Sequence, residues 1–117
     1  MVGDRPLRVG VAGAGTIAQV SHLPAYQKLP GVKVIALCDE DEAKAQRVAN
    51  RFNVPRVTGS IQELVAMNDL DAVDVCLPNH LHAEAVLGAL GAGKHVLCER
   101  PFTRNRREAE TVLAAAE

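Results

Sequence analysis

The sequence predicts an α/β fold of the Rossmann type, a doubly wound parallel sheet with helices on both faces. Three observations support this: apolar runs typical of buried parallel strands, helical segments between them, and a glycine turn directly after the first run. The simplest strand order for this alternation is 3-2-1-4-5. We expect a single domain over residues 1–117, because this length suits one domain of ordinary size.

The first elements of the chain have the order of a dinucleotide-binding site. An apolar strand over residues 7–12 precedes the turn Gly13-Ala14-Gly15-Thr16-Ile17-Ala18. A helix, a second strand over residues 32–38 and then Asp39 follow. A glycine turn alone is weak evidence, but here the strand, the helix and the acid all agree with it.

Each residue of the turn has a physical role. Gly13 suits the tight exit from the strand, Gly15 lets a pyrophosphate approach the backbone, and Ala18 permits close packing of helix on strand. The first helical turn, with Thr16 and Ile17, presents free N–H groups and the positive end of the helix dipole to the phosphates. The turn therefore predicts the phosphate half of a dinucleotide site.

Asp39 is the expected ribose ligand. It lies twenty-one residues beyond Ala18, at the carboxyl end of the second strand, where a carboxylate accepts hydrogen bonds from both ribose hydroxyls of an adenosine. Glu40, Asp41 and Glu42 follow it with no arginine beside them, so a 2′-phosphate would meet like charge. We expect NAD as the cofactor, in preference to NADP.

The remainder of the chain continues to alternate strands with helices. Pro24 is expected to kink or divide the helix after the glycine turn. Further strands are expected around Val57, over residues 72–77 and over residues 95–98. Further helices are expected from the Ser60–Glu63 capping box, over residues 80–92 before Gly93, and from Asn105 to the chain end.

Composition excludes several classes of partner. A net charge of −1 gives no electrostatic argument for nucleic acid or a membrane surface. The first six residues do not resemble a secretory signal and no apolar run approaches a membrane span, so we expect a cytoplasmic protein.

The cysteines and two of the histidines are assigned structural roles. The three cysteines, Cys38, Cys76 and Cys98, have no metal-ligand spacing, and we expect buried, reduced thiols and no metal site. His22 is expected on a surface helix and His95 on a strand, each with an ordinary role.

Four segments resemble the N-terminal domain of the Gfo/Idh/MocA oxidoreductases, the relatives of glucose-fructose oxidoreductase and inositol dehydrogenase. The resemblance covers nearly the whole chain, and the last two segments are more specific than the glycine turn. The segments are residues 13–18, Leu37-Cys38-Asp39, Leu77-Pro78-Asn79-His80-Leu81-His82, and Gly93-Lys94-His95-Val96-Leu97-Cys98-Glu99-Arg100-Pro101.

The resemblance implies an enzyme that binds NAD or NADP and oxidises or reduces a hydroxyl or carbonyl of a sugar, cyclitol or similar small molecule. It places Pro78 and Asn79 near the nicotinamide half of the cofactor, with His82 as the motif histidine there, in a cofactor-binding or catalytic role. It places Glu99 in the cofactor site and Arg100 at a catalytic position.

Arg100 departs from the family pattern. Glu99, Arg100 and Pro101 match a Glu-Lys-Pro motif whose lysine contacts substrate and assists proton transfer. A guanidinium stays protonated where a lysine can be desolvated to a useful pKa. Arg100 is therefore expected to orient a carbonyl or bind a carboxylate.

Family enzymes continue with a sixth strand and an α+β domain that holds the substrate. We expect this chain to be the cofactor domain without them, inactive alone, with self-association possible at the open sheet edge. Two other interpretations of the function stay open: a free-standing nucleotide-binding module without turnover, and an S-adenosylmethionine-dependent methyltransferase.

Overall fold

Five parallel strands form one sheet in the order β3-β2-β1-β4-β5 in the computed structural model, which describes residues 5–98 and 105–116. This is the strand order expected from the sequence. Because the chain first adds strands on one side of β1 and then on the other, the topological switch point lies at the carboxyl ends of β1 and β4. The strands are β1 (Leu7–Ala12), β2 (Val32–Cys38), β3 (Arg56–Thr58), β4 (Ala72–Val75) and β5 (His95–Cys98).

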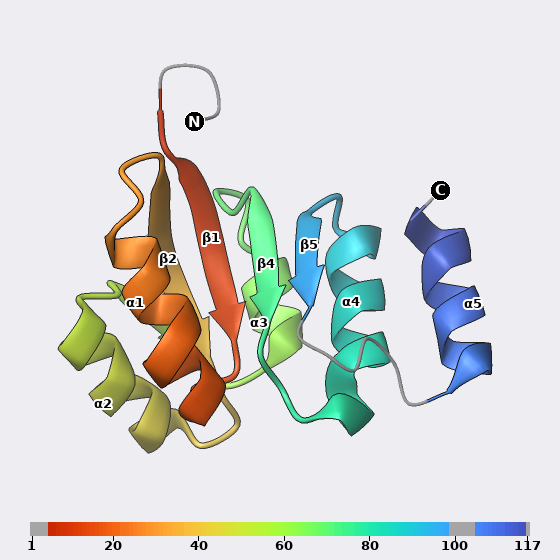
Figure 1. Cartoon of the computed structure of the whole chain (residues 1–117), viewed down its shortest axis with the longest axis horizontal. Helices are drawn as coiled ribbons and strands as arrows, with labels where there is room; N and C mark the ends of the chain where they lie inside the picture. The colour runs from red at the N-terminus through yellow and green to blue at the C-terminus, as the bar shows by residue number, and fades with distance from the viewer. Residues whose placement is uncertain (1–4, 99–104, 117) are drawn as a thin grey trace.

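Helices cover both faces of the sheet (Figure 1). One face buries apolar side chains against η1, α1 and α2, and the other against α3, α4 and α5. The helical elements are the π-helix η1 (Ala18–His22), α1 (Leu23–Gln27), α2 (Glu42–Phe52), α3 (Ile61–Val65), the 3₁₀ helix η2 (Asn79–Leu81), α4 (His82–Gly91) and α5 (Arg106–Ala116).

Two elements differ from the sequence prediction at the same place. β4 ends at Val75 and not at residue 77, although the Cys76 amide still donates to the Ala12 carbonyl at 2.7 Å. The expected helix over residues 80–92 is a 3₁₀ turn followed by α4. Pro78 lies between the two elements, where it has no N–H for a strand ladder and disfavours a helical conformation in the residue before it.

The helix after the glycine turn is divided where the sequence predicted. It changes from π to α geometry at Leu23, which leaves Pro24 in the first turn of α1, where its missing N–H costs little. Gly93 has φ +76° and closes α4 as expected, because the Lys94 amide bonds the Ala89 carbonyl at 2.9 Å in a Schellman motif.

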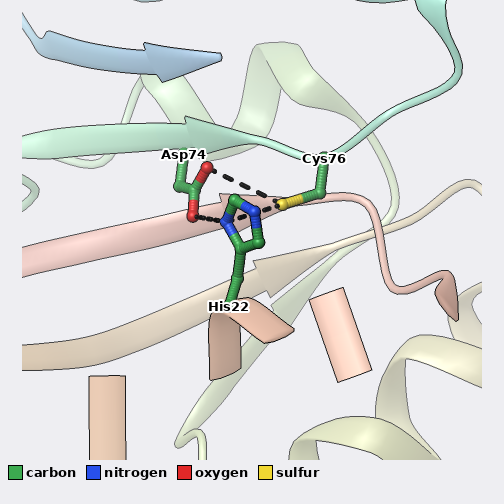
Figure 2. A group of neighbouring side chains, drawn as sticks. All are labelled: His22, Asp74 and Cys76. Atoms are coloured by element: carbon green, nitrogen blue, oxygen red, sulfur yellow. Dashed lines mark hydrogen bonds and ion pairs between the residues drawn. The ribbon is translucent and has the colours of Figure 1, made fainter. Parts of the chain in front are cut away.

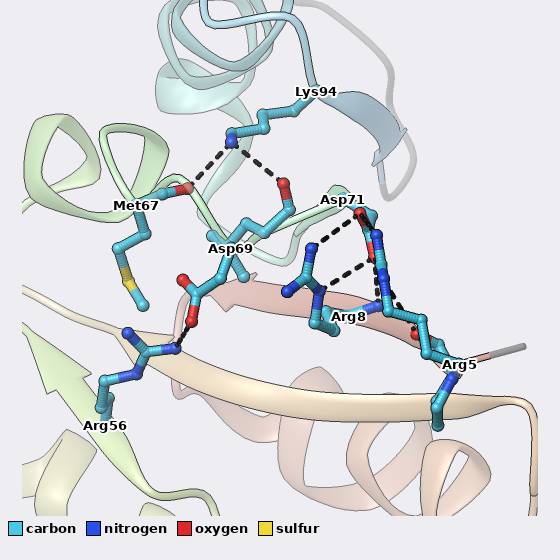
Figure 3. A network of polar contacts seen from close by, with 9 residues as sticks. Arg5, Arg8, Arg56, Met67, Asp69, Asp71 and Lys94 are labelled. Atoms are coloured by element: carbon cyan, nitrogen blue, oxygen red, sulfur yellow. Dashed lines mark hydrogen bonds and ion pairs between the residues drawn. The ribbon is translucent and has the colours of Figure 1, made fainter. Parts of the chain in front are cut away.

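Charged side chains stabilise the amino-terminal edge of the sheet, where the parallel strands begin (Figure 3). Asp71 accepts from the Arg5 guanidinium at 2.7 Å and from the Arg8 backbone amide at 2.8 Å. The Lys94 ammonium donates to the carbonyls of Met67 and Leu70 at 2.8 and 2.9 Å. These contacts lie at the edge opposite the carboxyl ends of the strands, so they serve the fold and leave the other edge open.

None of the helices described is both long and apolar enough to cross a membrane.

Candidate functional site

The glycine turn lies between the ends of β2 and β4, the two strands that flank β1. Gly13 has φ +105°, and a Cβ on it would meet the backbone carbon and oxygen of Cys76 at 2.8 Å. Its amide donates to the Cys38 carbonyl at 2.7 Å. No residue but glycine fits here, because both the backbone conformation and the close contact exclude a side chain.

Unlike Gly13, Gly15 is not required to be a glycine by any contact within the described chain. A Cβ built on Gly15 would have nothing within 4 Å, and its φ is not in the left-handed range. The residue borders a cleft together with Thr16 and Ile17, while Ala18 is fully buried beneath them. An absent side chain beside an open cleft, at the start of a helical segment, is the arrangement that a bound phosphate requires.

Asp39 is fixed at the end of β2 by backbone donors. Its Oδ2 accepts from the Ala14 amide at 2.9 Å, and its Oδ1 accepts from the Asp41 amide at 3.0 Å. The Lys44 ammonium, one turn into α2, lies 3.6 Å from Oδ2. Lys44 could not be identified from the sequence, because its approach to Asp39 depends on where α2 begins.

The cleft has a volume of about 600 Å³ and lies along the carboxyl ends of β1, β2 and β4. These ends are the arrowheads of the strands in Figure 1. One side of the cleft is bordered by Asp39, Lys44 and the Gly59–Gln62 segment. The other side is bordered by Pro78, His80 and Leu81. An elongated cleft across a switch point is where doubly wound folds bind nucleotides.

Of the residues expected near the nicotinamide, some border the cleft and others do not. Pro78 borders the cleft, and Asn79 is exposed at the start of η2. His82 is fully buried, and its Nε2 donates to the Leu77 carbonyl at 2.6 Å. This hydrogen bond ties His82 to the residue before Pro78, while His80 borders the cleft. Glu99, Arg100 and Pro101 lie outside the described residues.

The thiols are partly as expected. Cys38 and Cys76 are buried, whereas Cys98 is only half-buried because it lies on the last strand of the described sheet. Burial raises the pKa of the Cys38 thiol, so it is a poor nucleophile.

His22 is not the surface residue that the sequence predicted. Its imidazole points inward to Asp74 in β4 and to Cys76, the residue after β4 (Figure 2). The side chain of His22 is only 12% exposed. The Tyr26 hydroxyl also donates to Asp74, at 2.6 Å. Burial and this hydrogen bond raise the pKa of Tyr26, which keeps the phenol neutral. One signal could have indicated this cluster: Asp74 is an aspartate inside an otherwise apolar strand.

The fold and the cleft together define a domain of the dinucleotide-binding Rossmann class. The model of the Gfo/Idh/MocA oxidoreductases, an oxidoreductase family with an NAD-binding Rossmann fold, matches residues 7–117. The chain belongs to this family, as the four sequence segments implied.

Relatives of this chain include sugar-modifying enzymes. It is 43% identical over 111 residues to dTDP-3,4-didehydro-2,6-dideoxy-alpha-D-glucose 3-reductase of Actinomadura kijaniata, covering 95% of this chain and 33% of that protein. It is 39% identical over 108 residues to D-xylose 1-dehydrogenase (NADP(+)) 2 of Haloferax volcanii, covering 92% of this chain and 33% of that protein. The chain thus spans about a third of the length of these relatives.

Solved structures agree with this assignment. The crystal structure of a 3-ketoreductase from Actinomadura kijaniata in complex with NADP superposes with a TM-score of 0.90 at 43% identity, over 96% of this chain and 36% of that one. A myo-inositol 2-dehydrogenase from Lactobacillus plantarum superposes with a TM-score of 0.87 at 25% identity, over 95% of this chain and 33% of that one.

Proposed function

We propose that this chain binds a nicotinamide dinucleotide in the cleft and forms the cofactor domain of an oxidoreductase. The reaction is hydride transfer between the nicotinamide and a hydroxyl or carbonyl of a sugar, cyclitol or similar small molecule. The observation that carries the proposal is Gly15, whose missing side chain leaves space that no described protein atom occupies. The residues around it fit the cofactor, and the bound nicotinamide supplies or accepts the hydride.

Each part of the cleft has one task in this proposal. The backbone at Gly15, Thr16 and Ile17 holds the pyrophosphate, because these residues border the cleft at the start of a helical segment, where N–H groups have no intrahelical acceptor. Asp39 accepts hydrogen bonds from the ribose hydroxyls. Pro78, which borders the cleft, and the adjacent Asn79 lie beside the nicotinamide.

The experiment that tests this function is a pair of titrations on the 117-residue chain. NADH should bind saturably, with a change in nicotinamide fluorescence and a rise in melting temperature. S-adenosylmethionine, which methyltransferases with a similar glycine turn bind, should produce neither a saturable signal nor a thermal shift. Stabilisation by S-adenosylmethionine alone would contradict the proposal.

We also propose NAD(H) as the preferred cofactor. Asp39 is held by two backbone amides, and its carboxylate together with Glu40 places negative charge where a 2′-phosphate would lie. Lys44 offsets part of this charge, since it lies 3.6 Å from Asp39. The ribose hydroxyls of NAD carry no charge and gain the hydrogen bonds.

Catalysis in this proposal requires Arg100 and a second wall over the cleft. Arg100 orients the substrate carbonyl, because a guanidinium offers fixed donors without giving up a proton. The 117-residue chain alone should bind NAD and show no turnover of inositol, glucose or related polyols, because the substrate is not enclosed. Nicotinamide absorbance measures this directly, and turnover by this chain alone would contradict the requirement for a second wall.

The role of Arg100 is tested in a form of the protein that turns over substrate. Arg100→Ala should lower kcat/KM there, and Arg100→Lys should retain more of the rate than alanine does. An unchanged rate in Arg100→Ala would remove Arg100 from the active site.

A further inference from the structure

Three potential metal ligands meet beneath the cleft, on the face of the sheet that carries η1 and α1. His22 is the last residue of η1, Asp74 lies in β4, and Cys76 follows two residues later on the same side of the strand (Figure 2). One ligand atom from each lies within 4.8 Å of the other two. Asp74 is 1% exposed and Cys76 is 6% exposed, so the set is enclosed by protein.

The separations between these atoms approach those around a bound zinc ion. The Cys76 Sγ lies 3.4 Å from the His22 Nδ1 and 3.7 Å from the Asp74 Oδ1. Ligand atoms in a tetrahedral zinc site, with bonds of about 2.0–2.3 Å, lie about 3.3–3.8 Å apart. Only the distance from His22 Nδ1 to Asp74 Oδ2, 2.5 Å, must widen, and it is held short by a hydrogen bond that a cation would replace.

The donor chemistry selects the kind of metal. A thiolate, an imidazole and a carboxylate together suit Zn²⁺ or Co²⁺, and they do not suit Mg²⁺ or Ca²⁺, which take oxygen ligands. Tyr26 holds the Asp74 carboxylate in place without being a ligand itself, since its hydroxyl donates to Asp74 Oδ2 at 2.6 Å. Such a hydrogen bond to a ligating carboxylate is a regular feature of metal sites.

The helix that carries His22 adds an independent observation. Residues 18–22 adopt π geometry, which is rare and frequently marks functional sites. The wider turn precedes Leu23, a fully buried residue that anchors α1 to the sheet. The chain therefore accepts an unfavourable helical geometry at the segment that brings His22 to Asp74.

We propose that His22, Asp74 and Cys76 form a binding site for a zinc-class divalent cation. The cation takes His22 Nδ1, the Cys76 thiolate and an Asp74 oxygen as ligands, and leaves a fourth position for water or another donor. Binding releases the thiol proton of Cys76 to solvent and replaces the hydrogen bond between His22 Nδ1 and Asp74, whose proton leaves Nδ1 for solvent or for the other ring nitrogen. This site is separate from dinucleotide binding, which does not depend on it in the function proposed above.

The test uses Co²⁺ and Zn²⁺ on the reduced 117-residue chain. Co²⁺ should bind at one equivalent and give a thiolate-to-cobalt charge-transfer band with the visible bands of a tetrahedral site. Zn²⁺ should abolish these bands by displacement and raise the melting temperature. Absence of stoichiometric Co²⁺ binding by the unmodified chain would overturn the proposal, and that result needs no variant to fold.

Matched variants assign the ligands. Cys76→Ser should remove the charge-transfer band, whereas Cys38→Ser, at another buried thiol, should keep it. His22→Gln should weaken Co²⁺ binding at least tenfold, whereas His95→Gln, at an exposed histidine, should not. A band that persists in Cys76→Ser, or unchanged affinity in His22→Gln, would show that the metal binds elsewhere and the cluster only packs the helix on the sheet.

Discussion

At the scale of single residues, Asp39 is the proposed ribose contact that the fold already holds in place. Two backbone amides hold the carboxylate before any cofactor arrives, one from the glycine turn and one from the start of α2. A group that is already fixed loses little conformational freedom on binding, so more of its interaction with the ribose appears as affinity. The same rigidity prevents Asp39 from swinging away from a 2′-phosphate.

Cofactor preference follows from this arrangement. NADH should bind the chain at least about tenfold more tightly than NADPH, since like charge near the 2′-phosphate costs about 1.4 kcal/mol or more. Replacing Lys44 with alanine should widen the preference, because the cation 3.6 Å from Asp39 is removed. Fluorescence titrations with both cofactors measure the ratio, and equal or tighter binding of NADPH to the unmodified chain would refute it.

His82 is a second residue with a testable role. His82→Ala should lower the free energy of unfolding by about 1–3 kcal/mol, because the Leu77 carbonyl loses its donor. It should also weaken NADH binding, since the loop before Pro78 is no longer held. His82→Gln, which keeps a donor, should recover part of both losses. A folded His82→Ala variant with unchanged NADH affinity would show that His82 has no part in the site.

Much of the candidate site could be predicted from the sequence because its residues are close neighbours along the chain. The spacing of Gly13, Gly15 and Ala18 follows from one strand-turn-helix unit, and Asp39 follows from the next strand. Lys44 and His22 could not be predicted in the same way. Their positions depend on how a helix is set against the sheet, and local spacing carries no information on that.

At the scale of elements, the strands were predicted well because buried parallel strands are short apolar runs with clear ends. β1, β2 and β5 have the expected bounds. The π geometry of η1 was not predicted, since it arises from tertiary packing and has no composition signal. The early end of β4 was missed because the apolar run continues past the last ladder pair.

The amino-terminal edge of the sheet yields a stability prediction. The Arg5 guanidinium holds the pKa of Asp71 well below its ordinary value of 3.8, so Asp71 stabilises the fold above about pH 4 and this contribution is lost as the pH falls further. Asp71→Asn should lower the free energy of unfolding at pH 7 by about 2 kcal/mol and reduce its fall below pH 4. Urea unfolding at several pH values measures both effects.

A neighbouring ion pair is the control for this prediction. Asp69 pairs with Arg56 at 2.5 Å, but both side chains are more than 40% exposed, and Figure 3 shows this pair beside the Asp71 cluster. Asp69→Asn should change stability little, because exposed ion pairs contribute little. Both variants should bind NADH as the unmodified chain does, since this edge is opposite the cleft. Equal losses of stability in the two variants would contradict the special role of Asp71.

The whole molecule joins these features through its topology. The reversal of strand order at β1 and β4 opens the cleft, and the glycine turn, Asp39 and Pro78 reach it from three different connections. Because the strands are parallel, all three connections leave the same edge. Family membership and fold agree with this geometry, and binding of a nicotinamide dinucleotide at the glycine turn is the property to measure.

The most direct measurement is NADH titration of the unmodified chain beside two valine variants. Gly15→Val should fold, because a Cβ there meets no protein atom, yet should lose detectable binding because the side chain occupies the pyrophosphate position. Gly88→Val is the control, since Gly88 is equally open, does not border the cleft, and its variant should bind NADH normally. Saturable binding that disappears only in Gly15→Val is the result we expect. Undiminished binding by a folded Gly15→Val variant would contradict the account.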